Sequence, residues 1–162
     1  MSDGLELLRR AREVGLRIEP RPGGRLTVRG PKRAEPVALM LLAHKPAVIA
    51  ALAADWRTRH REALAYWGAL RPAPEAARLA WGEMQNRWHR LHGSRVPQWQ
   101  CAGCGEPISG LPALNLADGN RAHLDQAHGL DCLLSFGERW RREATGGLRT
   151  LGLDPPPSFE VL

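Results

Sequence analysis

The sequence has only three cysteines and no long apolar run, and we expect no signal peptide. An odd number of cysteines argues against a disulfide framework, which normally uses an even number in a short secreted chain. The most apolar stretch, 37–54, is interrupted by His44, Lys45 and Pro46, so no segment approaches the length of a membrane-spanning helix. We therefore expect a cytoplasmic protein that keeps its thiols reduced and does not bind a membrane.

The sequence also lacks the common catalytic motifs. It has no Walker loop, no G-x-S-x-G nucleophile turn and no H-E-x-x-H zinc motif. A zinc deaminase needs a glutamate two residues after its histidine, and Asp125 occupies that position after His123. We therefore predict that the protein is not an enzyme and has no small-molecule substrate.

The three cysteines all lie within 101–132. Cys101 and Cys104 form a C-x-x-C pair, whose two intervening residues let both sulfurs face one tetrahedral ion. Gly103 and Gly105 suit this turn, because glycine tolerates positive φ. A histidine and Cys132 would complete a closed set of four ligands, which is typical of a structural zinc site.

Two alternatives to zinc can be weighed. A thioredoxin-type redox pair needs a helix directly after the C-x-x-C, whereas 106–110 has the composition of a loop. Unrelated buried or surface thiols are the other alternative. We favour one structural zinc ion as the cofactor.

The fourth ligand is either His123 or His128. His123 follows a turn signal at 118–120, whereas His128 stands four residues before Cys132, at helical spacing. Gly129 argues against a continuous helix through His128 and Cys132, so we favour His123.

The formal charge of +6 is unevenly distributed. Residues 1–54 contain ten Lys and Arg against five Asp and Glu, residues 55–98 eight against four, and residues 99–162 five against eight. The basic part favours an acidic partner, either nucleic acid or an acidic peptide, although a GC-rich genome also produces arginine-rich proteins.

The first third of the chain predicts a helix, two strands and two further helices. Apolar residues at helical spacing predict a helix over 5–14 that ends at Gly15. Alternation predicts a hairpin with its turn at 20–24, apolar residues on one face and basic residues on the other. Prolines at first-turn positions predict helices over 37–44 and 47–53.

Four stretches carry a resemblance to a known family. They are Leu5-Glu6-Leu7-Leu8-Arg9-Arg10-Ala11, Gly15-Leu16-Arg17-Ile18, Gly24-Arg25-Leu26-Thr27-Val28 and Leu41-Leu42-Ala43-His44-Lys45-Pro46-Ala47-Val48-Ile49-Ala50-Ala51-Leu52. In these stretches and in its order of elements, the chain resembles the TubC N-terminal docking domain family. In that family the domain binds a short acidic tail of a partner protein through an exposed hairpin edge and basic residues.

The resemblance implies that residues 1–54 bind another protein through an acidic tail. The implied partner-binding residues are Arg25, Thr27, Arg29, Lys32 and Arg33. A solvated basic edge that only discourages aggregation is the alternative. Founding members of the family precede a large assembly-line synthetase, and residues 55–162 contain no such module.

Residues 55–98 predict two amphipathic helices packed as a hairpin. The apolar stripes are Trp56, His60, Ala63, Trp67 and Leu70, then Ala77, Trp81, Met84, Trp88 and Leu91. Their helical phase favours tryptophans that pack in a core over tryptophans that stack on bases. His89 and His92, next to Arg87 and Arg90, either form a polar basic patch or, as we expect, are solvated surface residues.

Residues 99–162 predict the metal site, a hairpin around Asp118 and Gly119, and a final helix. Cys132 should lie in the first turn of this helix, where we expect the helix dipole to lower the pKa of its thiol. The layout is that of a treble-clef-like zinc module. A Cys-x-x-Cys-Gly motif precedes a histidine and a Cys-led helix that contains Trp, and the tail Leu148-Arg149-Thr150-Leu151-Gly152-Leu153 follows. In these features the segment resembles small uncharacterised zinc-knuckle proteins of bacterial mobile elements, which carry no known activity.

These observations predict an α+β protein in three parts. Residues 1–54 form a docking-like αββαα domain, 55–98 a helical hairpin, and 99–162 a zinc-binding module with a C-terminal helix. The leading hypothesis is a non-catalytic adaptor that binds an acidic peptide tail. The alternative is a nucleic-acid-binding accessory protein of phage or mobile-element DNA processing.

Overall fold

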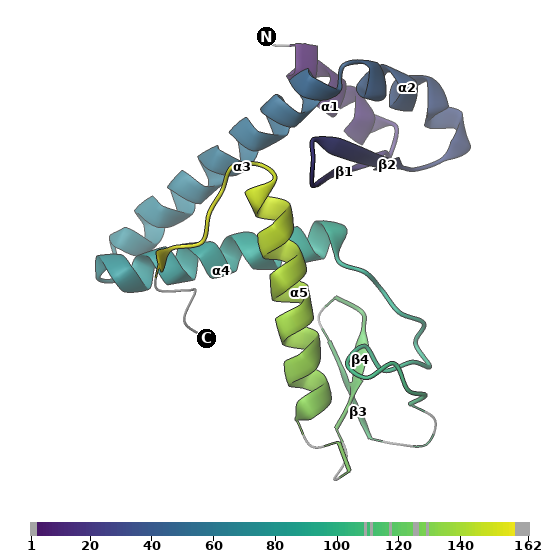
Figure 1. Cartoon of the computed structure of the whole chain (residues 1–162), viewed down its shortest axis with the longest axis vertical. Helices are drawn as coiled ribbons and strands as arrows, with labels where there is room; N and C mark the ends of the chain where they lie inside the picture. Colours follow the sequence, from purple (N-terminus) through teal and green to yellow (C-terminus); the bar gives the residue numbers. More distant parts are fainter. Residues whose placement is uncertain are drawn as a thin grey trace. The chain divides into compact units, whose positions relative to one another are not determined.

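The computed structural model describes residues 3–157, except 109, 111, 117, 125, 126 and 129. This part of the chain contains α-helices and two small antiparallel hairpins, which confirms the predicted α+β class (Figure 1). The α-helices are α1 (Asp3–Glu13), α2 (Glu35–Ala43), α3 (Lys45–Gly68), α4 (Ala73–His92) and α5 (Asp131–Arg149). The strands are β1 (Arg17–Arg21), β2 (Arg25–Arg29), β3 (Ala113–Asn115) and β4 (Arg121–His123), and a 3-10 helix, η1, covers Lys32–Ala34.

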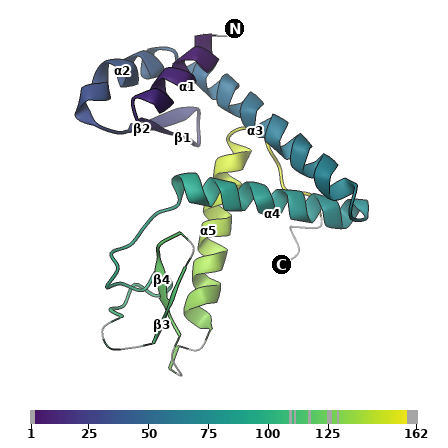
Figure 2. The same ribbon diagram turned by 180° about the vertical axis from the view of Figure 1, so that it is seen from behind.

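The chain divides into two compact units. The first unit comprises residues 1–84 and 145–162, and the second unit comprises 85–144. Both α4 and α5 therefore contribute residues to each unit. Figure 2 shows these two helices from behind. The predicted three-part division at residues 54 and 98 stays a prediction about how the chain folds.

Helix α1 ends as its sequence predicts. Gly15 has a φ of +78°. Its N–H donates to the carbonyl of Arg12 at 3.1 Å, and the N–H of Leu16 donates to that of Ala11 at 2.8 Å. These two bonds form a Schellman motif, in which glycine adopts the left-handed conformation at little steric cost. The chain thereby turns directly from α1 into β1.

The first hairpin is tighter than predicted. Arg21 pairs with Arg25 and Pro20 pairs with Leu26, so the turn covers only 22–24 rather than 20–24. Gly23 and Gly24 both have positive φ, which lets so short a loop reverse the chain. Pro20 is buried and its apolar neighbours on the same face are half-buried, so this face lies toward the rest of the first unit.

Helix α3 is much longer than predicted. It runs without interruption from Lys45 to Gly68, so the predicted end at residue 53 is wrong. No glycine or proline stands between Pro46 and Gly68, and nothing in this segment therefore ends the helix. Helices α1 and α3 pack closely at Gly4. A Cβ added at this position would lie only 2.3 Å from the carbonyl oxygen of Ala47.

Three of the four tryptophans of the predicted helical hairpin pack in the interior, whereas Trp67 is half-buried. Trp56 and Trp81 are 4% and 0% exposed, which agrees with core packing rather than an open stacking surface. The ring of His60 on α3 meets that of Trp81 on α4 edge to face, with centroids 6.1 Å apart. The outer ends of the predicted stripes differ, because Leu70 and Leu91 are both exposed.

No single helix among the described residues is long and apolar enough to span a membrane. The segments 32–43 and 45–68 meet the length and composition test only when taken together, across a bend of 90°.

Candidate metal centre

The structure brings together the four residues predicted as metal ligands. One ligand atom from each of Cys101, Cys104, His123 and Cys132 lies within 4.8 Å of all the others. Nδ1 of His123 is 3.4 Å from Sγ of Cys104 and 3.9 Å from Sγ of Cys132. A tetrahedral zinc ion would hold sulfur and nitrogen ligands about 3.5 Å apart. The donor set and its spacing therefore fit zinc.

The loop at 101–105 positions the sulfurs of Cys101 and Cys104. Sγ of Cys101 accepts backbone hydrogen bonds from Gly103 at 3.3 Å and from His123 at 3.4 Å. Gly105 has a φ of +84°, as expected for this turn. Gly103 is needed for another reason, because a Cβ there would lie 2.3 Å from the carbonyl oxygen of Cys132. The absence of a side chain at Gly103 lets the start of α5 approach the loop.

The segment after the C-x-x-C pair folds back on the segment before it. Cys101 N–H donates to the carbonyl of Glu106 at 2.8 Å, and Ile108 N–H donates to that of Trp99 at 2.8 Å. Among the described residues, no helix begins before Asp131 in this region. This differs from a thioredoxin-type pair, in which a helix follows the C-x-x-C directly.

Strand β4 presents His123 to the three sulfurs. His123 pairs with Ala113 of β3 and is 1% exposed. Nε2 of His123 lies 3.2 Å from the carbonyl oxygen of Pro107. Because a carbonyl oxygen only accepts, Nε2 carries the hydrogen, and Nδ1 of the neutral ring keeps its lone pair for the cluster. His128 instead stacks on His123, with ring centroids 4.1 Å apart and planes 15° apart.

Helix α5 provides the last sulfur. Cys132 is buried in its first turn, where the sequence predicted it. The expected fall in its pKa is wrong: burial and the neighbouring thiols of Cys104 and Cys101 raise the pKa of Cys132 to about 12. These effects oppose the helix dipole.

The thiol of Cys101 shifts in the opposite direction. Burial raises its pKa, but hydrogen bonds from the backbone of Cys104, His123 and Gly103 outweigh burial, and the pKa of Cys101 falls to about 6. These hydrogen bonds therefore favour the thiolate form of Cys101. A bound cation would favour the thiolate form of all three cysteines.

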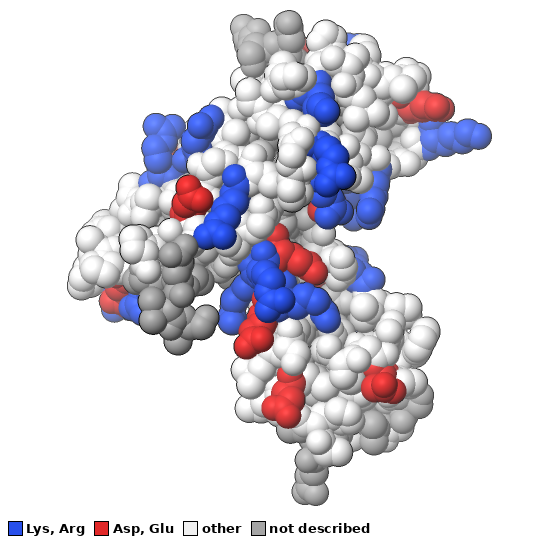
Figure 3. All heavy atoms as spheres, in the orientation of Figure 1, with Lys and Arg blue, Asp and Glu red and all other residues white. Residues whose placement is uncertain are grey.

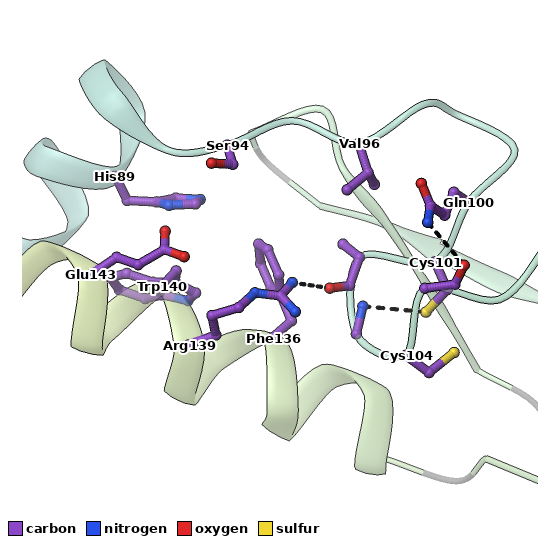
Figure 4. A pocket seen from close by; sticks show the side chains of 13 residues that line it. His89, Ser94, Val96, Gln100, Cys101, Cys104, Phe136, Arg139, Trp140 and Glu143 are labelled. Carbon is purple, nitrogen blue, oxygen red and sulfur yellow. Dashed lines mark hydrogen bonds between the residues drawn. The ribbon is translucent and has the colours of Figure 1, made fainter. Parts of the chain in front are cut away.

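A cavity of about 260 Å³ lies beside the C-x-x-C loop (Figure 4). Phe136, Arg139 and Trp140 of α5 line one side of it, and the loop lines another. The guanidinium of Arg139 donates a hydrogen bond to the carbonyl of Ala102 and lies 5.9 Å from the centre of the Phe136 ring. This contact ties α5 to the loop that carries two of the cysteines.

No family model, curated protein or solved structure matches this chain. The resemblance to the TubC docking domain family therefore stays a prediction from the quoted residues, and the site is interpreted from its own geometry.

A buried polar network next to the metal centre escaped the sequence analysis. Asn120 is 1% exposed, accepts from Val96 N–H at 3.0 Å and donates to the carbonyl of Ser94 at 3.2 Å. It also donates to Asp118, whose carboxylate lies 2.6 Å from Nε2 of His89. Burial raises the pKa of Asp118, but hydrogen bonds from Asn120 and His89 lower it overall.

His89 is thus not a solvated surface residue. Its ring also packs against Phe136 and Trp140 of α5, with centroids 5.7 Å and 5.0 Å away. The network joins the end of α4 to the turn between β3 and β4, and this hairpin carries His123. The only sequence signal was the Asp-Gly-Asn turn, which identifies the hairpin but not its distant partners.

The five predicted partner-binding residues lie on β2 and just after it. Arg25 and Arg29 are exposed, Thr27 is half-buried between them, and Lys32 and Arg33 are exposed on η1. The sequence analysis did not select Arg17 and Arg21, which the hairpin places opposite Arg29 and Arg25. Strand alternation would have found them once the turn was fixed at 22–24. On the face drawn in Figure 3, Lys and Arg side chains form several separate groups.

Proposed function

We propose that Cys101, Cys104, His123 and Cys132 bind one zinc ion as a structural centre. The four ligands would fill a tetrahedral shell and leave no position for a reacting water molecule, which is the arrangement of structural sites. Three of the four side chains are buried, which also favours a stabilising role. Bound zinc would cross-link the C-x-x-C loop, β4 and α5. A C-x-x-C loop, then a hairpin, then a helix that carries a ligand is the order that supports a treble-clef-like module.

We further propose that the protein is a non-catalytic adaptor that binds an acidic peptide tail of a partner protein. The observation that carries this proposal is the arginine pairing on the first hairpin. Arg17 faces Arg29 and Arg21 faces Arg25 across the two strands. Like charges directly opposite one another destabilise a sheet, so the hairpin retains an unfavourable arrangement that an anionic partner would relieve.

The rest of the hairpin supports the same partner. Glu19 is the only acidic residue of the two strands, and its carboxylate lies 3.0 Å from the guanidinium of Arg21. The remaining arginines can form charge-assisted hydrogen bonds with carboxylates. A two-stranded sheet also keeps outer backbone donors and acceptors that an extended peptide can complete. These features favour the αββαα docking-like interpretation of residues 1–54.

Charge reversal on β2 tests this proposal. We expect the Arg25→Glu/Arg29→Glu variant to lose at least about tenfold in affinity for a short labelled peptide of alternating Glu and Val, measured by fluorescence anisotropy. Arg78→Glu/Arg90→Glu is the matched control, because both residues are exposed on α4 and the change in charge is equal. Equal losses in both variants, or unchanged affinity in the β2 variant, would exclude this surface.

Nucleic acid is the alternative partner, and the basic excess of residues 1–98 favours it. A gel-shift assay across a salt series separates the two hypotheses. A steep loss of DNA affinity with rising salt supports nucleic-acid binding, and no binding at low salt dismisses it.

A further inference from the structure

The first unit has an open cavity of about 520 Å³ on α3. Arg57, Thr58, His60 and Arg61 of α3 line it, and Leu153 and Asp154 from the segment after α5 form another side. Its volume lies in the range of small-molecule sites, which is about 300–1,000 Å³. This cavity is separate from the hairpin face and from the cysteine cluster.

Two arginines dominate the charge of the cavity. Arg57 and Arg61 are four residues apart, so they project from the same face of α3, where two like charges destabilise the helix. Within the described part of the chain, neither forms an ion pair with Asp or Glu. Asp154 also lines the cavity, and its carboxylate lies 3.8 Å from the guanidinium of Arg149. The lining therefore carries two guanidinium groups against one carboxylate, which is an excess of positive charge.

Thr58 adds a neutral donor between the arginines. Its Oγ1 accepts a hydrogen bond from Arg61 at 3.1 Å, so the hydroxyl hydrogen remains available to a ligand. The same bond restrains the guanidinium of Arg61. Two guanidinium groups and a hydroxyl on one helical turn suit an anion with several acceptor oxygens, such as phosphate.

His60 gives the cavity a flat ring. It is half-buried, and burial lowers its pKa, so the ring is neutral at neutral pH. The ring of Trp81 on α4 contacts the His60 ring in a T-shaped arrangement, with centroids 6.1 Å apart. A neutral imidazole held in place offers a surface on which a nucleobase can stack.

We propose that this cavity binds the phosphate group of a nucleotide, either free or within a nucleic acid strand. Arg57 and Arg61 bind the phosphate oxygens, Thr58 donates a third hydrogen bond, and His60 with Leu153 contacts the base or sugar. This second site goes beyond the adaptor function.

Calorimetry with adenosine monophosphate, adenosine and a short single-stranded DNA tests the phosphate assignment. We expect the phosphate-bearing probes to bind at least about tenfold more tightly than adenosine. The Arg57→Glu/Arg61→Glu variant should lose that advantage, whereas the Arg78→Glu/Arg90→Glu control should keep it. Equal binding of adenosine, an unaffected cavity variant, or no binding of either phosphate probe would overturn the proposal.

The same titrations identify the source of the phosphate. If the site serves free nucleotides, adenosine monophosphate should displace the DNA. If it serves nucleic acid, the DNA should bind more tightly than the mononucleotide, and the cavity variant should flatten the salt dependence of DNA binding. Nucleotide binding is compared between the native chain and the Arg57→Glu/Arg61→Glu variant, and peptide binding between the native chain and the Arg25→Glu/Arg29→Glu variant, so failure of the peptide proposal and failure of this one are distinguishable.

Discussion

At the scale of single residues, the metal centre depends as much on what surrounds the cysteines as on the cysteines themselves. Gly103 has no side chain, and this allows the backbone of Cys132 to approach the C-x-x-C loop. The carbonyl of Pro107 orients His123. Backbone N–H groups lower the pKa of Cys101 while burial raises that of Cys132. Neighbours therefore decide which atoms meet and which of them carry charge.

Gly103→Ala tests the close approach. The added methyl group would clash with the carbonyl of Cys132. We therefore expect the free energy of unfolding of the second unit to fall by about 1–3 kcal/mol and the affinity for zinc to decrease. The measurements are thermal unfolding and competition with a zinc chelator. Gly137→Ala on α5 is the control, because its Cβ would find no atom closer than 3.9 Å and should leave stability unchanged or raised by up to about 1 kcal/mol. Equal effects of the two substitutions would contradict this account.

Sequence reasoning selected the four residues that the structure brings together, because few residue types can bind zinc and the C-x-x-C spacing is itself informative. The pKa of Cys132 could not be predicted, because its burial depends on residues far away in sequence. His89 was misjudged for the same reason, since its partner Asp118 lies 29 residues away.

At the scale of elements, local sequence signals predicted that helices and hairpins form better than they predicted the residues at which these elements begin and end. The end of α1 followed from Gly15, but α3 continued past residue 53 because no breaking residue stops it before Gly68. The first hairpin has a shorter turn than its five turn-forming residues suggested, and this places Arg21 opposite Arg25. The register of the strands, which only the structure provides, is what revealed the paired arginines.

Asn120→Ala tests how the second hairpin is held. The substitution removes the partners of Val96 N–H and the Ser94 carbonyl, and we expect a loss of about 2 kcal/mol in the free energy of unfolding of the second unit. Urea denaturation monitored by tryptophan fluorescence measures it. Asn115→Ala on the exposed side of β3 is the control and should change little. A small effect at Asn120 would show that the buried network does not stabilise the hairpin.

At the scale of the whole molecule, the excess of basic residues and the candidate metal ligands lie in different parts of the chain. The basic excess lies in residues 1–98, while the cysteines lie in a segment with more acidic than basic residues. This separation supports a chain in which one part binds anionic partners and another is a metal-stabilised scaffold. The cysteine cluster belongs entirely to the second unit, whereas the hairpin and the α3 cavity belong to the first.

Removal of the metal should therefore affect the two units differently. We expect a strong chelator to unfold residues 85–144, because binding of a structural zinc ion contributes on the order of 10 kcal/mol to folding. Residues 3–54 should keep their slow amide hydrogen exchange. Hydrogen exchange read by mass spectrometry, with and without chelator, distinguishes this from a uniform loss of protection, which would mean that the metal stabilises the whole chain.

Native mass spectrometry of freshly purified protein tests the central claim most directly. The four-ligand centre predicts a mass increase that corresponds to one zinc ion per chain, and this increase should disappear when Cys132→Ser removes one ligand. Protein that carries no ion before any chelator is added would contradict a structural zinc centre at Cys101, Cys104, His123 and Cys132.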